Sequence, residues 1–408
     1  MKNIDRKYAN LLVETALNVQ PNQTLIINAG PEHHEFVALL TEEAYKLKAK
    51  QVIVKFTSEQ ISRLHYLYQS EETLTHIPES LILEHDEYLK EDLVKLALRS
   101  PNPGLMNDVD ASKVMAVSQV RGKALQAFAN YSMSNQGQWL VAAYPTYNWA
   151  KAVFPELEAQ AAYDKLYEYI LYATRVTEDN DPKQEWEKHN AQLHKQNNAL
   201  NAYNFESVHF KNGLGTDITI GLVKGHIWSG GNSPSQKGVP FNANVPTEES
   251  FTTPDRMNVN GIVYNTLPLN NNGRLIDKFW LKFEDGIVVD FDAEQGKEAL
   301  EGLLNTDENS RRIGEIALVS FDSPISNLKT LFYNTLFDEN ASCHIALGKG
   351  YPLIENGGSM SRDELLERGI NQSLIHVDFM FGSEDMHAEG TTFDGNTVTI
   401  IKEGNIVL

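Results

Sequence analysis

Two residues near the C-terminal end have the types and the spacing of metal ligands. The segment 375–380 (IHVDFM) has the composition of a short strand and carries His376 and Asp378 two positions apart. Side chains two apart on a strand point to the same face, so both can reach one ion. Imidazole and carboxylate groups suit zinc, cobalt, manganese or ferrous iron. Taken alone, the pair also fits the polar face of an ordinary strand.

His344, Glu315 and Glu249 lie further upstream and extend this pair to a set with the composition of a metal site. Two arrangements are compatible with the set. His344, His376 and Asp378 match the two-histidine, one-carboxylate group that holds a single Fe(II) in oxygenases. The additional glutamates favour two divalent ions, because carboxylates offset the positive charge and can bridge the metals.

Composition and missing motifs argue against several classes of function. The 408 residues carry 35 Lys and Arg against 55 Asp and Glu, a formal net charge of −20. This balance disfavours nucleic acid or an anionic membrane surface as a partner. The sequence contains no GxxxxGK, GxGxxG, HExxH or GxSxG motif, so nucleotide-driven chemistry and serine hydrolysis are disfavoured as well.

The cysteine content and the N-terminal residues predict a cytoplasmic location. Cys343 is the only cysteine, which excludes an intramolecular disulfide and fits a reducing compartment. The N-terminal residues lack the apolar core of a signal peptide, and no apolar run is long enough to span a bilayer.

The elements that position these residues fall into two parts with different textures. Residues 1–182 alternate helical and strand-like segments, with strands expected over 24–28 and 51–56 and a helix over 84–99. This order predicts an α/β domain with a largely parallel sheet. A polar, helix-like linker is expected over 183–204.

Residues 205–408 contain short strands separated by turn residues. Asn-Gly or Asp-Gly pairs at 212–213, 285–286 and 394–395 are flanked by apolar or alternating runs, which is typical of hairpins. We therefore expect an α+β domain rich in antiparallel or mixed sheet. All the metal-site residues fall in this C-terminal domain, which is expected to be the catalytic one.

Segments spread over nearly the whole chain resemble the aminopeptidase T family of metallo-aminopeptidases. No single segment is decisive, but their order and spacing together are specific. The matching runs are YANLLVETALNVQPNQTLII (8–27), WLVAAYPTYNWAKAVFP (139–155), GTDITIGLVKGHIWSGG (215–231), NVPTEESFTTPDR (244–256), IGEIALV (313–319), NTLFDENASCHIALGKGY (334–351) and IHVDFMFG (375–382).

The resemblance implies a cocatalytic pair of divalent ions, zinc, cobalt or manganese, in the C-terminal domain. It also implies removal of N-terminal residues from short peptides, and a homodimer in which the N-terminal domain helps to enclose the site. The family's tyrosine beside the metals falls on Tyr351. Its metal ligands fall on Glu249, Glu315, Glu339, His344, His376 and Asp378.

Hydrolysis by such a pair uses a metal-bridging hydroxide and one further group that takes the water proton and passes it to the leaving amine. Glu248 is the first candidate for this base because it is adjacent to the proposed ligand Glu249. Glu339 is the rival if it is not a ligand. Tyr351 is expected to donate a hydrogen bond to the oxyanion or to touch a metal.

Two other functions are alternatives to the aminopeptidase. One is a mononuclear Fe(II) dioxygenase that opens pyridine-type rings, since such enzymes resemble this fold family; the other is a metal-binding protein without turnover. The additional carboxylates favour hydrolysis over the first, and the presence of Tyr351 and Glu248 argues against the second. Most other histidines, His189 among them, have no partner at an informative spacing, so surface or helix-face positions are expected for them.

Overall fold

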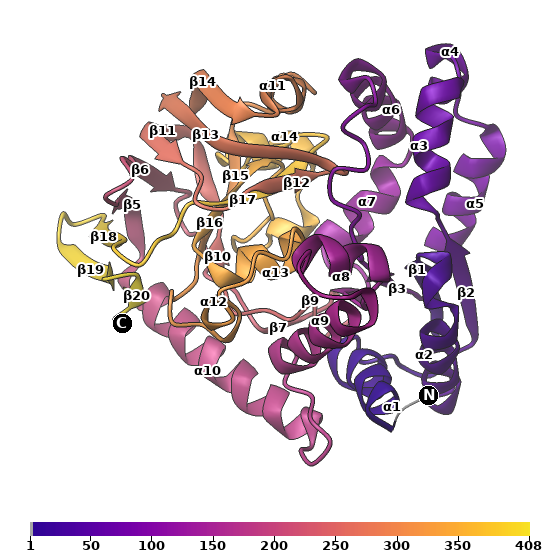
Figure 1. The fold of residues 1–408 in the computed structure, drawn as a ribbon. Helices are drawn as coiled ribbons and strands as arrows, with labels where there is room; N and C mark the ends of the chain where they lie inside the picture. Colours follow the sequence, from indigo (N-terminus) through magenta and orange to yellow (C-terminus); the bar gives the residue numbers. More distant parts are fainter. Residues whose placement is uncertain (1–2) are drawn as a thin grey trace.

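A parallel five-stranded sheet organises the N-terminal part of the chain (Figure 1). The structure is a computed structural model and describes residues 3–408. In their order across the sheet, the strands are β2 (Gln51–Phe56), β1 (Thr24–Ala29), β3 (Leu93–Leu98), β4 (Trp139–Ala142) and β9 (Asn244–Val245). β1 is buried along most of its length, as expected for a parallel sheet covered on both faces.

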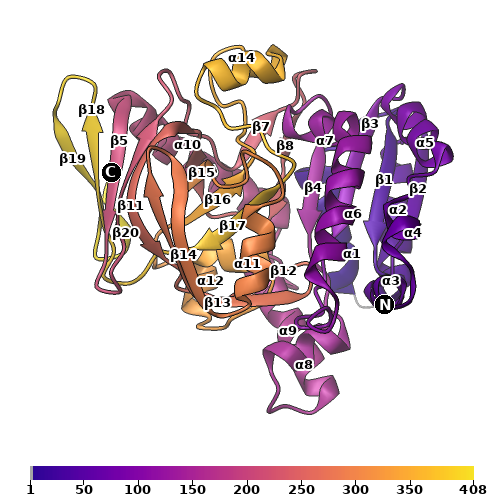
Figure 2. The same cartoon turned by 90° about the horizontal axis from the view of Figure 1, so that it is seen from above.

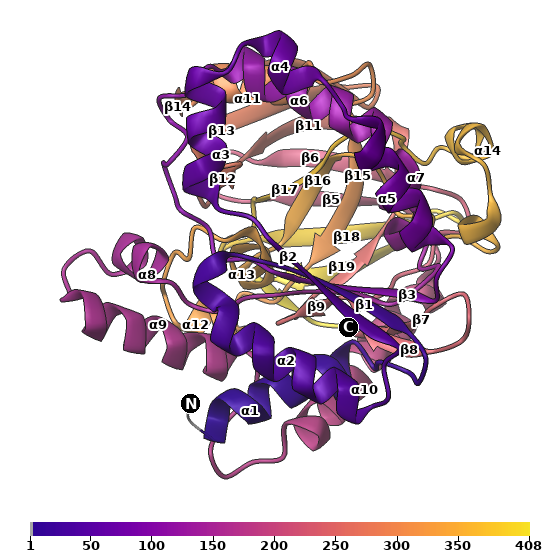
Figure 3. The same ribbon diagram turned by 90° about the vertical axis from the view of Figure 1, so that its right-hand side faces the viewer.

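Helices cover both faces of this sheet (Figure 3). Phe36 and Trp149 join the apolar core on one face, whereas Tyr131 packs with Leu93 on the other. The helical segments are α1 (Asn3–Asn10), the π-helix η1 (Leu11–Ala16), the 3₁₀ turn η2 (Pro31–His33), α2 (His34–Lys46), α3 (Glu59–Tyr68), α4 (Glu71–Thr75), α5 (Glu79–Leu89), α6 (Ala111–Ala124), α7 (Gln126–Met133), α8 (Tyr147–Val153) and α9 (Ala159–Ala173).

The helix predicted over residues 84–99 is wrong in its second half. α5 ends at Leu89, and Leu93–Leu98 (LVKLAL) forms β3. Leucine, lysine and alanine favour a helix by propensity. β3 nevertheless pairs with β1 on one side and β4 on the other, and burial between these two strands decides its conformation. The strands predicted over 24–28 and 51–56 are confirmed.

α10 (Pro182–Tyr203) occupies the predicted polar linker. Asp181 caps its N-terminus by accepting a hydrogen bond from the backbone of Lys183, and Asn204 ends it in the left-handed conformation. The helix buries one side, including Trp186 and Leu200. It therefore packs against the protein rather than crossing solvent.

Antiparallel sheets dominate the part that follows α10 (Figure 2). The larger sheet contains β12 (Leu269–Asn271), β13 (Arg274–Glu284), β11 (Pro254–Tyr264), β6 (Asp217–Leu222), β5 (Phe205–Lys211), β18 (His387–Thr392), β19 (Thr397–Lys402) and β20 (Asn405–Ile406), with β14 (Ile287–Gln295) paired to β13. The second sheet has the order β10 (Ser250–Thr252), β15 (Ile313–Leu318), β16 (His344–Gly348) and β17 (His376–Met380).

Short helices and one small hairpin complete this part. They are β7 (Asn232–Pro234), β8 (Pro240–Asn242), α11 (Lys297–Leu304), α12 (Pro324–Asn327), α13 (Thr335–Asp338), η3 (Glu339–Ala341), η4 (Gly357–Ser359) and α14 (Arg362–Glu367). The three predicted Gly-containing turns connect β5 to β6, β13 to β14 and β18 to β19.

The predicted fold class is confirmed: a parallel α/β layer is followed by antiparallel sheets. β9 is an exception to a simple division, because it comes from the second part of the chain and pairs in parallel with β4. The division into 1–182, 183–204 and 205–408 stays a prediction. Within residues 3–408, no helix has the length and apolar character needed to cross a membrane.

Candidate metal centre

The register of the four-stranded sheet places four predicted ligands on one of its faces. Ala346, in the middle of β16, is paired with Glu315 on β15 and with Asp378 on β17. Directly paired residues of antiparallel strands point to the same face, and so do residues two apart on one strand. His344 and His376, two positions before Ala346 and Asp378, therefore share this face. The methyl group of Ala346 leaves the space between the two carboxylates open.

The opposite face of these strands is apolar and holds them in place. Ile316, Ile345, Leu347 and Phe379 alternate with the ligands and are buried in the core shared with the larger antiparallel sheet. A strand slipped by one residue would turn the ligands into that core. Packing on one face thus fixes the geometry of the site on the other.

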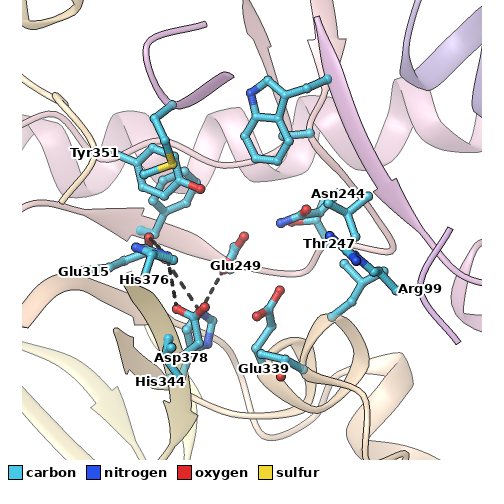
Figure 4. A pocket seen from close by; sticks show the side chains of 18 of the residues that line it. Arg99, Asn244, Thr247, Glu249, Glu315, Glu339, His344, Tyr351, His376 and Asp378 are labelled. Atoms are coloured by element: carbon cyan, nitrogen blue, oxygen red, sulfur yellow. Dashed lines mark ion pairs between the residues drawn. The ribbon is translucent and has the colours of Figure 1, made fainter. Parts of the chain in front are cut away.

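Two further predicted ligands approach from segments beside the sheet. Glu249 immediately precedes β10, and Glu339 is the first residue of η3. Their exposed fractions are 5% and 8%, so both carboxylates are withdrawn from bulk water. Figure 4 shows both side chains directed toward the ligands on the sheet.

The distances between ligand atoms are those of a compact cluster (Figure 4). His344 Nε2 lies 3.0 Å from Glu249 Oε2, and His376 Nε2 lies 3.5 Å from Asp378 Oδ1. Glu315 faces both imidazoles, with Oε1 3.8 Å from His344 Nε2 and Oε2 3.6 Å from His376 Nε2. One carboxylate thus offers one oxygen to each histidine, as a carboxylate bridging two ions would.

All six predicted ligands come together in three overlapping groups. Within each group, the ligand atoms all lie within 4.8 Å of one another. The groups are Glu249, Glu315 and His344; Glu315, His376 and Asp378; and Glu339, His344 and Asp378.

Backbone carbonyls orient both imidazoles. His344 Nδ1 lies 3.1 Å from the carbonyl oxygen of Ser342, and His376 Nδ1 lies 2.7 Å from that of Lys349. A carbonyl oxygen only accepts, so each Nδ1 carries a hydrogen and donates it. Each Nε2 is thereby directed at the carboxylates and is available to coordinate an ion.

Burial and mutual repulsion perturb the ionisable groups of the cluster. Burial raises the pKa of Glu315 to about 7, against the hydrogen bond with His344 and together with the charge of Asp378. Burial, Asp378 and Glu249 raise the pKa of Glu339 well above its usual value. Burial lowers the pKa of His344, but its contacts with Glu249 and Glu315 outweigh this effect and raise it. Carboxylates crowded in this way favour protons or cations as partners.

The donor set fits divalent cations. Asp378 Oδ1 is buried and accepts no hydrogen bond from residues 3–408, which suits an atom that faces an ion. Two imidazoles and four carboxylates converge. Four negative charges would offset the charge of about +4 that two divalent ions carry.

Tyr351 lies on the wall of the same site. Its ring makes edge-to-face contacts with His376 and Phe251, at centroid distances of 5.2 and 5.7 Å. Burial raises the pKa of its hydroxyl well above the usual value, and Glu315 and other carboxylates act in the same direction. The hydroxyl therefore stays protonated and can donate a hydrogen bond.

Glu248 faces a different environment from the adjacent Glu249. Its Oε1 lies 2.7 Å from Nη2 of Arg175, and its Oε2 lies 3.8 Å from Nε2 of His189. Its backbone N–H donates to Oδ1 of Asn340 over 2.6 Å. Glu248 therefore lies outside the ligand cluster. Its role as the base stays a prediction.

His189 lies on the buried face of α10, so the expectation of a helix-face position is met, whereas that of a surface position is not. His189 Nε2 lies 2.7 Å from the carbonyl oxygen of Thr247, and its Nδ1 lies 3.1 Å from Arg175 Nη2. Burial, helped by the charge of Arg175, lowers the pKa of His189 to about 4, so the ring is neutral. It donates to Thr247 and accepts from Arg175, which anchors the segment before Glu249. No local pattern signals a contact between residues 58 positions apart.

A cavity of about 760 Å³ opens onto the cluster between the two parts of the chain. One side of its wall carries the six ligands and Tyr351. The other side includes Arg99, Ser100 and Pro101, which follow β3 directly. Ligands of open parallel sheets commonly bind at this carboxyl edge of the strands, and the volume is typical of a small-molecule site. Sequence reasoning did not identify Arg99.

Known relatives match the chain over almost its full length. The family described as thermophilic metalloprotease (M29) matches residues 2–406. Aminopeptidase 2 of Geobacillus stearothermophilus is 43% identical over 400 residues, which cover 98% of this chain and 96% of the relative. Aminopeptidase AmpS of Bacillus subtilis (strain 168) is 41% identical, covering 98% of this chain and 97% of its own.

Two solved structures match the chain, and one of them supports the same family. Wild-type AmpT from Thermus thermophilus matches with a TM-score of 0.89 and 36% identity, covering 99% of both chains. The 2,5-dihydroxypyridine dioxygenase from Pseudomonas putida KT2440 matches with a TM-score of 0.52 and 11% identity, covering 99% of this chain and 96% of its own, which shows a shared fold alone. The resemblance to the aminopeptidase T family is confirmed, and the chain belongs to the thermophilic metalloprotease (M29) family.

Proposed function

We propose that this protein is a metal-dependent aminopeptidase that releases N-terminal residues from short peptides. The observation that carries the proposal is the convergence of two histidines and four carboxylates on one wall of the cavity. Membership of a metalloprotease family and relatives named aminopeptidases support hydrolysis as the reaction.

Two divalent ions, zinc, cobalt or manganese, are proposed for the cluster. Glu315 would help to hold both, because each of its oxygens faces a different histidine. Glu249, His344, His376 and Asp378 would be further ligands. Glu339 completes the set near His344 and Asp378. When bound, such ions polarise a peptide carbonyl and lower the pKa of a coordinated water.

The chain's own residues supply the proton transfer and the orientation of the substrate. A carboxylate must take the proton of the attacking water and pass it to the leaving amine. Two carboxylates are candidates for this base. Glu339 lines the cavity, whereas Glu248 is paired with Arg175. We propose Tyr351 as the donor to the oxyanion, because its hydroxyl is protonated and the residue lines the cavity.

Selectivity for a free amino terminus follows from the acidic wall of the site. An α-ammonium group is attracted by the carboxylates, whereas an acetylated terminus carries no charge. We therefore expect N-acetylated peptides to be poor substrates. Equal rates with free and acetylated peptides would contradict exopeptidase action.

Metal-dependent cleavage of leucine-p-nitroanilide tests the proposed reaction. Activity should disappear on chelation and return with zinc, cobalt or manganese. If Glu315 is shared by two ions, the metal content should be about two ions per chain. The content should be lower in Glu315→Gln. Oxygen uptake with ferrous iron and a hydroxypyridine would support a dioxygenase instead. Metal binding without turnover of either substrate would indicate a non-catalytic protein.

We further propose a cytoplasmic homodimer. The single cysteine supports a reducing compartment, and the family resemblance supports the dimer. Light scattering coupled to gel filtration would measure a mass near twice 45.9 kDa. A mass of one chain at micromolar concentration would contradict the dimer.

A further inference from the structure

One permanent positive charge lies on the wall of the cavity. Among the described residues that form this wall, Arg99 is the only arginine or lysine. Figure 4 shows it near Thr247 and Asn244, on the side away from Glu315 and His376. The acidic residues of the wall are Glu59, Glu249, Glu315, Glu339 and Asp378.

The backbone of Arg99 is tied to both parts of the chain. Its N–H donates to the carbonyl of Ala142, at the end of β4, over 2.8 Å. Its carbonyl accepts a hydrogen bond from Nδ2 of Asn334 over 3.2 Å. Asn334 caps α13, the helix that leads directly to Glu339. The position of Arg99 relative to the ligand cluster is therefore set by the fold rather than by a loose loop.

The guanidinium group of Arg99 has no fixed partner. Within the described part of the chain, its side chain forms no hydrogen bond and no ion pair within 4.0 Å. Desolvation by the surrounding protein lowers its pKa below the usual value, and the charge of Glu59, which also lines the cavity, opposes this effect. An arginine stays charged in proteins, and the Arg99 side chain is exposed within the cavity. Its guanidinium is therefore accessible to an anion that enters the cavity.

Every unmodified peptide substrate carries such an anion at its C-terminus. With its amino-terminal residue at the ligand cluster, a peptide extends into the cavity by at most about 3.3–3.6 Å per residue. The C-terminal carboxylate of a short peptide therefore lies within a few residue lengths of the ligand cluster. Arg99 is the only arginine or lysine among the described residues of the wall, and the net charge of −20 disfavours the carboxylate elsewhere on the protein.

We propose that Arg99 binds the C-terminal carboxylate of short peptide substrates. The inference rests on the proposed aminopeptidase function and adds the substrate class: short peptides with a free carboxyl end. Charge-assisted hydrogen bonds from a guanidinium to a carboxylate are strong and often bidentate. Peptides that are longer or amidated cannot form these hydrogen bonds with Arg99.

Matched substrates test this role directly. The kcat/KM of the metal-loaded protein is measured for Leu-Gly-Gly and for Leu-Gly-Gly amide. We expect a ratio of acid to amide on the order of tenfold to a hundredfold, mostly through KM, from the usual strength of charged hydrogen bonds. Arg99→Met should bring the ratio close to one, and Arg99→Lys should retain part of it. Arg63→Met is the control, because Arg63 pairs with Asp108 away from the cavity; its ratio should equal that of the wild type.

Each outcome decides one question. Equal kcat/KM for acid and amide in the wild type would overturn the inference, as would a loss of both to the same extent in a folded, metal-loaded Arg99→Met. If Arg99→Met does not fold, the wild-type ratio and its reduction in Arg99→Lys decide. Failure of the proposed function is distinct, because the metal-loaded wild type would then cleave neither peptide.

Discussion

The guanidinium of Arg175 lies 2.7 Å from the carboxylate of Glu248, in an ion pair that is largely buried. The next residue, Glu249, directs its carboxylate at His344 instead. The two consecutive glutamates therefore have different roles. Glu248 anchors the segment to the first half of the chain, and Glu249 faces the candidate metal centre. Arg175 and His189 together hold the backbone from which Glu249 reaches the cluster.

Breaking this ion pair from one side should cost more stability than removing both partners. Glu248→Gln and Arg175→Met each leave a buried charge unpaired, which typically costs about 3–5 kcal/mol. The double variant leaves no unpaired charge, so we expect it to recover part of the lost free energy of unfolding. Urea unfolding of the four proteins measures the coupling. Additive losses would show that the two groups do not interact.

The same double variant tests whether Glu248 is the base. Loss of a general base lowers kcat by roughly 10²–10⁴-fold. A folded, metal-loaded double variant with such a loss would support the role predicted from the sequence. A kcat within a few-fold of the wild type would limit Glu248 to positioning Glu249.

Tyr351→Phe should lower turnover without changing metal content. Phenylalanine keeps the edge-to-face contacts with His376 and Phe251 but lacks the hydroxyl. Loss of one oxyanion donor usually lowers kcat by about 10²–10³-fold. The exposed Tyr172 provides a matched control in Tyr172→Phe, which should behave as the wild type. An unchanged kcat in Tyr351→Phe would reduce Tyr351 to a packing role.

Metal affinity should rise with pH through the range in which Glu315 titrates. Burial raises the pKa of Glu315 to about 7, so below that pH a proton must leave before an ion binds. We expect the affinity to rise by up to about tenfold per pH unit for this proton between about pH 5 and 7. Calorimetric titration in buffers of different ionisation enthalpy measures both the affinity and the proton release.

The stability of the metal-free protein should change in the opposite direction. The folded protein binds the Glu315 proton more tightly than the unfolded chain does, since the unfolded pKa is about 4.3. The contribution of this group to the free energy of unfolding is therefore fully present below about pH 4.3 and is lost as pH rises through about 7. Glu315→Gln cannot titrate, so a slope of the same size in that variant would contradict the assignment.

Gly230→Ala should weaken metal binding by displacing Glu249. A Cβ atom on Gly230 would lie 2.1 Å from the carbonyl oxygen of Glu249, so the backbone there must shift. We expect a loss of about 1–3 kcal/mol in stability, as for other overpacked sites, together with lower metal content.

Gly302→Ala is the matched control for this change. Gly302 lies in α11, and a Cβ there would meet no atom within 4 Å. Alanine is the better helix former by about 1 kcal/mol, so this variant should be slightly more stable and bind metal normally. If Gly230→Ala kept the wild-type metal content, its contact with Glu249 would not position the ligand.

Local patterns were enough to predict several features. The strands at 24–28 and 51–56 and the hairpin turns at 212–213, 285–286 and 394–395 have signals within a few residues of one another. The spacing of His376 and Asp378 placed them correctly on one face of β17. The helix expected over 84–99 failed because pairing with β1 and β4, which no local pattern records, overrides the helix propensity of β3.

The sequence by itself determined the residue types of the candidate metal site, the strand that carries His376 and Asp378, and, through its resemblance, the family. Only the tertiary structure decided that Ala346 sits between Glu315 and Asp378 in register, that Arg175 draws Glu248 away from Glu249, and that Arg99 faces the cavity. These relations join residues far apart in the chain. They depend on the register of strands and the packing of two sheets. The local sequence pattern around any one of these residues does not record either of these.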